Sequence, residues 1–222
     1  TFGDTGKGGV TRFSLSPEAL AARAEFKKRM EAIGATVVTD DMANLYATLP
    51  GSEALPAILT GSHLDSVKKG GNYDGVLGVL SAMEALETIA RERAPHRHPL
   101  TAIVWTNEEG ARYEPAMMSS GVVCGKFDKE KMLASVAKDV PGLTFGEALR
   151  KSGCAGDEKN RMSPDKYAAL VELQIKANPR AAERIEIVQT DREGDAADAE
   201  QFLVDGKANI AIDTGAAKPM VY

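Results

Sequence analysis

The chain has 222 residues, of which 43% are hydrophobic and 27% are charged, enough for one large domain, or for one domain and part of another, with a sizeable core. The net charge of −5 argues against a nucleic-acid surface, which needs clustered Lys and Arg. The sequence has no apolar run of about 18 residues, and its two cysteines offer no disulfide framework. We therefore expect a cytoplasmic protein that binds neither nucleic acid nor a membrane.

The first predicted elements are a helix and a pair of strands. Residues 16–34 predict a helix, because Ser16 is a good N-cap and Pro17 suits the first turn. Residues 36–51 predict two short strands around a turn at Asp40 and Asp41.

Two continuous apolar runs give the strongest strand signals. They cover residues 56–62 and 100–107, and they are typical of strands that are buried on both faces of a sheet. An amphipathic helix is predicted between them, over residues 74–93, and a further helix and strand at 144–153 and 166–175. Strands that alternate with helices indicate an α/β fold, with a sheet covered on both faces.

Acidic side chains and a histidine follow the two apolar strands. His63 and Asp65 come after the first strand, and Glu108 and Glu109 come after the second. In α/β sheets, functional groups gather beyond the carboxyl ends of the strands. Asp74 lies at the predicted start of the next helix, after a glycine-rich segment that allows it to come close. We expect these five side chains to converge.

A mixture of imidazole and carboxylates suits zinc or a similar divalent ion. Several carboxylates at one place repel one another without a cation, and two cations bridged by one carboxylate would relieve this repulsion. Adjacent glutamates point different ways on an extended chain, so one can bind a metal while the other faces its bound water. The chemistry that follows is metal-assisted hydrolysis.

Each of these signals has a structural alternative when it is taken alone. A histidine at a strand end can be only a hydrogen-bonded residue, and Asp74 can be a helix N-cap. We expect His96 and His98 to lie at the surface of a polar loop, and Cys124 and Cys154 to be small buried residues. Either cysteine could instead serve as a nucleophile, but nothing in the sequence brings it near a histidine.

The motifs resemble those of one family. The chain is similar to the zinc-dependent amidohydrolases that include N-carbamoyl-L-amino-acid hydrolases, β-ureidopropionases and allantoate amidohydrolases, which are relatives of the di-zinc aminoacylases and carboxypeptidases. The resemblance extends from about residue 6 to 155 and is carried by "GKGGVTRFSLS", "GSHLDSV", "GGNYDGVLGVLSAMEAL" and "HPLTAIVWTNEEGARYEPAMMSSGV".

The resemblance implies a role for each residue of the cluster. His63, Asp74 and Glu109 match the metal ligands, with Asp74 as the bridging ligand. Glu108 matches the general base, and Asp65 matches the acid that orients His63. The substrate-binding residues are not identified.

The family also implies a fold, cofactors and partners. The fold is a di-zinc exopeptidase-like α/β domain, a mixed sheet with helices on both faces, into which an α+β lid domain is inserted that forms a homodimer. Residues 1–180 would be the N-terminal part of the catalytic domain, and residues 181–222 the start of the lid or a loosely specified tail. The cofactor would be Zn²⁺, or Mn²⁺, Co²⁺ or Ni²⁺, with two ions per site and a small-molecule substrate.

The sequence departs from the family after residue 171. Family members carry a Glu-Leu-His-Ile-Glu-Gln-Gly strand whose histidine binds the second metal, and the matching "ELQIKANP" has Gln174 at that position and Ala177 at the glutamine. We expect this chain to bind at most one divalent ion tightly and to have little or no amidase activity, unless Asp191 or Glu193 replaces the missing ligand.

The expected activity is hydrolysis of a linear amide or ureido C–N bond. An N-carbamoyl-L-amino acid is the expected substrate, and the amino acid, carbon dioxide and ammonia are the products. One alternative is a di-zinc aminoacylase or exopeptidase with the same machinery and a different pocket. The other is a non-catalytic relative or fragment that lacks the second metal site.

Overall fold

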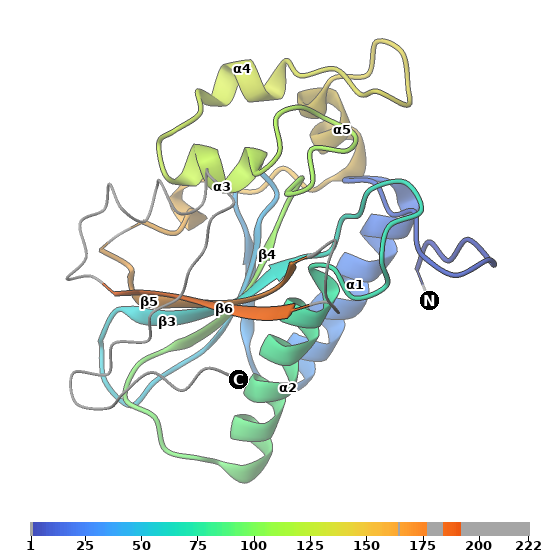
Figure 1. Ribbon diagram of the computed structural model, residues 1–222. Helices are drawn as coiled ribbons and strands as arrows, with labels where there is room; N and C mark the ends of the chain where they lie inside the picture. The colour runs from blue at the N-terminus through green and yellow to red at the C-terminus, as the bar shows by residue number, and fades with distance from the viewer. Residues whose placement is uncertain (1, 164, 177–183, 192–222) are drawn as a thin grey trace.

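The computed structural model describes residues 2–163, 165–176 and 184–191. Six strands form one sheet, in the order β1-β2-β4-β3-β5-β6 (Figure 1). The strands are β1 Thr36–Thr39, β2 Leu45–Leu49, β3 Ala57–His63, β4 Leu100–Trp105, β5 Tyr167–Lys176 and β6 Arg184–Asp191. The three strands β4, β3 and β5 run parallel, while β1, β2 and β6 pair antiparallel with their neighbours. The sheet is therefore mixed, as expected.

Two long helices cover one face of this sheet. They are α1, Pro17–Ala32, and α2, Val76–Glu92, which lie next to each other in Figure 1. Phe26 and Met30 of α1 pack with Met83 and Leu86 of α2 over the apolar side chains of β2 and β4. The side chain of Ser16 accepts a hydrogen bond from the backbone of α1, as predicted for an N-cap.

Three shorter helices gather beyond another part of the sheet (Figure 1). They are α3, Met118–Val123, α4, Lys129–Leu133, and α5, Phe145–Ser152, and a 3₁₀ turn, η1, covers Glu158–Asn160. α3 and α5 enclose an apolar cluster in which the rings of Tyr113 and Phe145 meet edge to face at 5.2 Å. Val123 of α3 packs against the sheet face that α1 and α2 leave open, so helices contact both faces.

The predicted elements are all present, with some differences. α2 begins at Val76 rather than Asp74, and its N-cap is Gly75, which offers no side-chain hydrogen bond. The helix α4, the turn η1 and the strand β6 are not predicted from the sequence. β6 pairs antiparallel with β5 and forms the edge of the described sheet.

In the described part of the chain, no helix combines the length and the apolar character needed to span a membrane.

Candidate metal centre

Strand register places the site at the carboxyl ends of β3 and β4. His63 is the last residue of β3 and lies opposite Trp105, the last residue of β4. β3 also pairs in parallel with β5 on its other side. The chain therefore crosses from β3 to β4 on one side and then returns to β5 on the opposite side of β3. Ligands bind at such switch points in open α/β sheets, beyond the strand ends.

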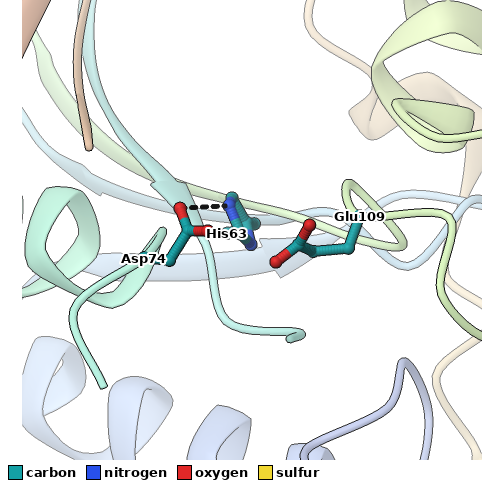
Figure 2. A group of neighbouring side chains, drawn as sticks. All are labelled: His63, Asp74 and Glu109. Atoms are coloured by element: carbon teal, nitrogen blue, oxygen red, sulfur yellow. Dashed lines mark ion pairs between the residues drawn. The ribbon is translucent and has the colours of Figure 1, made fainter. Parts of the chain in front are cut away.

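Asp74 approaches His63 from the loop that leads into α2 (Figure 2). Its Oδ1 lies 3.9 Å from Nε2 of His63. The next residue, Gly75, has φ +65°, and a Cβ atom there would lie 2.5 Å from the imidazole ring. Glycine is required at this position for both reasons, because other residues avoid this φ and any side chain would displace the ring.

Three side chains form a group that suits a divalent metal ion. His63, Asp74 and Glu109 each offer one ligand atom, and these atoms all lie within 4.8 Å of one another. Two ligand atoms on one tetrahedral zinc ion are about 3.3–3.6 Å apart, because each lies about 2.0–2.2 Å from the metal. Small side-chain rotations would therefore complete the geometry, and the nitrogen and oxygen donors fit Zn²⁺.

Glu108 lies beside this group but is not part of it. Its Oε2 is 3.3 Å from Nε2 of His63. Burial raises the pKa of Glu108 to about 7, with the charges of Asp65, Glu109 and Glu172 adding to the increase and the charge of His63 opposing it. A carboxyl group with a pKa near neutrality can both accept and return a proton.

Asp65 connects the two loops of the site. Its two carboxylate oxygens accept hydrogen bonds from the backbone N–H groups of Glu108 and Glu109, each at 3.2 Å. Nδ1 of His63 donates to the backbone carbonyl oxygen of Asp65 at 2.9 Å, whereas the Asp65 carboxylate is 3.8 Å away. The ring is thus oriented by the carbonyl rather than by the carboxylate that the family resemblance implies. This tautomer leaves the lone pair of Nε2 for a metal.

The electrostatics of the metal-free site favour a cation. His63 is buried, which lowers its pKa, but the surrounding carboxylates outweigh burial and raise the pKa to about 9. Burial also raises the pKa of Glu109. The carboxylates of Asp65, Asp74, Glu108 and Glu109 surround the one imidazole of His63, and a divalent ion would add positive charge among them.

The remaining sequence candidates lie elsewhere. His96 and His98 are half-buried, and their Nδ1 atoms bond to backbone carbonyl oxygens of His98 and Pro56. Cys154 is partly exposed and Cys124 is exposed, so the expectation that both are buried is wrong. The backbone of Gln174 lies in β5 opposite Glu186; its side chain, the Asp191 side chain and Glu193 lie outside the described residues.

One supporting residue was missed from the sequence. Asn107 is fully buried with φ +57°, and its Nδ2 donates to the carbonyl oxygens of Tyr113 and Pro115 at 2.8 and 3.3 Å. This left-handed residue turns the chain directly before Glu108. Asparagine adopts this conformation more readily than most residues, which is the only signal that could have identified it.

A family model matches part of the chain. Residues 44–148 match the model described as Peptidase family M28. This segment contains all five residues of the candidate site.

More specific relatives are amidohydrolases. The chain is 39% identical over 174 residues to an N-carbamoyl-L-amino-acid amidohydrolase of Rhizobium meliloti, which covers 78% of this chain and 41% of that protein. It is 32% identical over 175 residues to an allantoate amidohydrolase of Bacillus subtilis, covering 78% and 42%.

Solved structures agree. A hydantoinase/carbamoylase family amidase from Burkholderia ambifaria matches with a TM-score of 0.68 and 38% identity, over 70% of this chain and 38% of that one. The family resemblance is therefore confirmed: the chain is related to the N-carbamoyl-L-amino-acid and allantoate amidohydrolases. It spans about two fifths of the length of these relatives.

Proposed function

We propose that the protein is a metal-dependent amidohydrolase that cleaves a linear amide or ureido C–N bond. The substrate we propose is an N-carbamoyl-L-amino acid, and the products are the amino acid, carbon dioxide and ammonia. The observation that carries this proposal is the metal-ligand group of His63, Asp74 and Glu109 with the carboxyl of Glu108 beside it. The names of the relatives support the ureido class of substrate.

The positions of the site residues indicate a different role in the reaction for each of them. His63, Asp74 and Glu109 would hold the divalent ion, Zn²⁺ by its donor set, with Mn²⁺, Co²⁺ or Ni²⁺ as alternatives. A bound ion of this kind lowers the pKa of a water ligand to about 7 and polarises the substrate carbonyl. Glu108 would accept the proton of that water and return it to the leaving nitrogen. Asp65 would hold both glutamates through their backbone amides.

The number of ions follows from Gln174. A Gln amide oxygen is a weaker zinc ligand than the imidazole that relatives carry at this position. We therefore propose one tightly bound ion and low activity in this chain, and we expect Gln174→His to strengthen a second site. The homodimer, the lid that residues 181–222 would begin and the cytoplasmic location remain proposals that rest on the family and on composition.

Calorimetric zinc titration with a substrate panel tests this function. We expect one tight site per chain, and hydrolysis of N-carbamoyl amino acids, however slow, that exceeds hydrolysis of dipeptides and N-acetyl amino acids. A preference for dipeptides or N-acetyl amino acids would favour the exopeptidase or aminoacylase alternative. Failure to bind any divalent ion would favour a non-catalytic relative, and two tight sites would contradict the role given to Gln174.

A further inference from the structure

An N-terminal segment runs alongside the loop that links His63 to Asp74. Val10 and Gly70 exchange backbone hydrogen bonds in both directions, at 2.9 and 2.8 Å. The backbone N–H of Lys69 donates to the hydroxyl of Thr11 at 2.9 Å. The loop that connects two proposed metal ligands is therefore held by residues more than fifty positions earlier in the chain.

Arg12 attaches this segment on both sides of Asp65. Its backbone N–H donates to the hydroxyl of Ser66 at 2.9 Å, and its carbonyl oxygen accepts from the backbone N–H of Ser66 at 3.0 Å. On the other side, Nε of the guanidinium donates to the carbonyl oxygen of Leu64. Arg12 thus fixes the residue before Asp65 and the residue after it.

The guanidinium of Arg12 is buried, with only 4% of the residue exposed. Nη1 donates to the carbonyl oxygen of Phe2 at 2.7 Å, while Nη2 has no hydrogen-bond partner among the described residues. Burial lowers the pKa of Arg12, and the negative charge of Asp65 opposes this effect. Burying a cation with incomplete hydrogen bonding costs free energy, and a nearby carboxylate offsets part of that cost.

We propose that Arg12 is a positioning residue for the metal centre. It holds residues 64–66 in the conformation in which the Asp65 carboxylate reaches the backbone amides of Glu108 and Glu109. Among the described residues, no hydrogen bond or ion pair joins Arg12 to either glutamate, to His63 or to Asp74, so its effect is expected to pass through Asp65. The consequence for metal binding rests on the proposed function, whereas the link from Arg12 to the two amides does not.

The first test needs no metal. We would measure amide hydrogen exchange in the metal-free protein for wild type, Arg12→Met and the control Arg29→Met. Arg29 is a suitable control because its guanidinium pairs with Glu87 on α2, at 2.9 and 2.7 Å, instead of contacting the site loops. We expect exchange at the Glu108 and Glu109 amides to accelerate about tenfold or more in Arg12→Met, relative to amides of β2. Unchanged relative exchange would overturn the proposal.

The second test measures zinc affinity in a double-mutant cycle. We expect Arg12→Met to weaken the tight site about 10- to 100-fold, as is typical when a supporting residue is lost. In an Asp65→Asn background the same substitution should have little further effect, since both act through one contact; additive losses would contradict the proposal.

Arg12→Lys keeps the charge but loses the fork of donors, and we expect it to fall between wild type and Arg12→Met. It also replaces Arg12→Met in both tests if that variant does not fold. Wild-type protein that binds no zinc would refute the proposed function alone, and the exchange measurement would still decide the role of Arg12.

Discussion

Two groups of clustered acids in this protein are compensated in different ways. The first lies in the turn between β1 and β2. The carboxylate of Asp40 accepts hydrogen bonds from the backbone of Met42, from the backbone and side chain of Asn44, and from the hydroxyl of Tyr46, at 2.8–2.9 Å. Next to it, Asp41 pairs with Arg161 at 2.6 and 2.7 Å and with Lys129 at 2.6 Å. Nearby groups of the β1–β2 region therefore satisfy Asp40, and two cations from α4 and the end of η1 balance the charge of Asp41.

The second group is the candidate metal centre. Asp65 accepts two backbone amides there and Glu109 accepts one, from Val67, while the carboxylates of Asp74 and Glu108 lie 3.9 and 3.3 Å from Nε2 of His63. The contrast teaches that a cluster of acidic side chains is not in itself a metal site, since the acids of the turn around Asp40 are balanced without a metal. What distinguishes the metal centre is negative charge that the chain's own groups leave incompletely balanced.

The largest effect that we expect comes from Glu108. Replacing it with glutamine should leave zinc content unchanged, because the metal-ligand group is His63, Asp74 and Glu109. It should lower the turnover of an N-carbamoyl amino acid by about 10²-fold or more, because the proton acceptor is lost. Turnover would be measured under zinc saturation, in the Gln174→His background if wild-type activity is too low.

Glu109→Gln is the matched variant, and we expect it to lose zinc. If Glu108→Gln loses the metal and Glu109→Gln retains it, the roles of the two glutamates are reversed. Glu108 would then belong to the metal-ligand group of the second acidic cluster, and Glu109 would be the proton acceptor.

A smaller effect is expected from the backbone next to Asp74. Gly75→Ala places a Cβ atom at φ +65° and 2.5 Å from the His63 ring. We expect a loss of about 2 kcal/mol in the free energy of unfolding, from strain and displacement of the ring. Gly71→Ala is the control, since a Cβ atom there meets no atom within 4 Å. Urea unfolding of both variants measures the change in the free energy of unfolding. Equal losses in the two variants would show that the His63 ring is not tightly held.

The self-compensated turn makes a third prediction. Asp41→Asn leaves Arg161 and Lys129 without their anionic partner, and the side chain of Asp41 is only 10% exposed. Because both cations can turn partly to solvent, we expect a cost of about 1–2 kcal/mol, below that of a fully buried pair. Glu53→Gln breaks a similar but exposed pair with Arg97 and should change the urea midpoint little. A metal should not rescue Asp41→Asn.

Much of the site could be predicted because it depends on local signals. Apolar runs identified β3 and β4, and the rule that parallel strands end at one edge brought His63 and Glu109 together. The hydrogen bonds of Asp65 could not be foreseen, since they depend on how Asn107 turns the chain after β4. The role of Arg12 was hidden for a related reason: its partners in the site loop, Leu64 and Ser66, lie more than fifty residues away in the sequence.

Prediction of the fold from the sequence has the same limit. Helix α1 follows from its cap and spacing, whereas β6 has many charges and lacks a clear period, so that its pairing with β5 decides its conformation. Short α4 has two apolar residues, Met132 and Leu133, too few to show a helical period, and none of its residues is fully buried. Elements that depend on tertiary contacts are those that the sequence conceals.

The last and smallest effect is the pH dependence of stability, where the two acidic groups should have opposite signs. In the metal-free protein, burial raises the pKa of Glu108 from 4.5 to about 7. Its contribution to the free energy of unfolding is therefore fully present below about pH 4.5 and is lost as the pH rises through 7. Burial also raises the pKa of Asp41, but Arg161 and Lys129 outweigh it and hold the pKa below 3.8. The stability from Asp41 is therefore present above about pH 4 and is lost only in more acidic solution.

Urea unfolding with a chelator should accordingly show a decrease in the free energy of unfolding, on the order of 1 kcal/mol, between pH 5 and pH 8. His63 adds to this decrease, because its pKa is raised from 6.5 to about 9 and its protonated form is the one that the folded site favours. Zinc should reverse the slope, since metal binding requires the deprotonated ligands and strengthens as the pH rises.

Glu108→Gln should flatten the pH dependence of unfolding in the metal-free protein, whereas Asp41→Asn should leave it unchanged above pH 5. A slope that Glu108→Gln does not alter would mean that this carboxyl is as well compensated as those of the turn, and the distinction between the two acidic groups would fail.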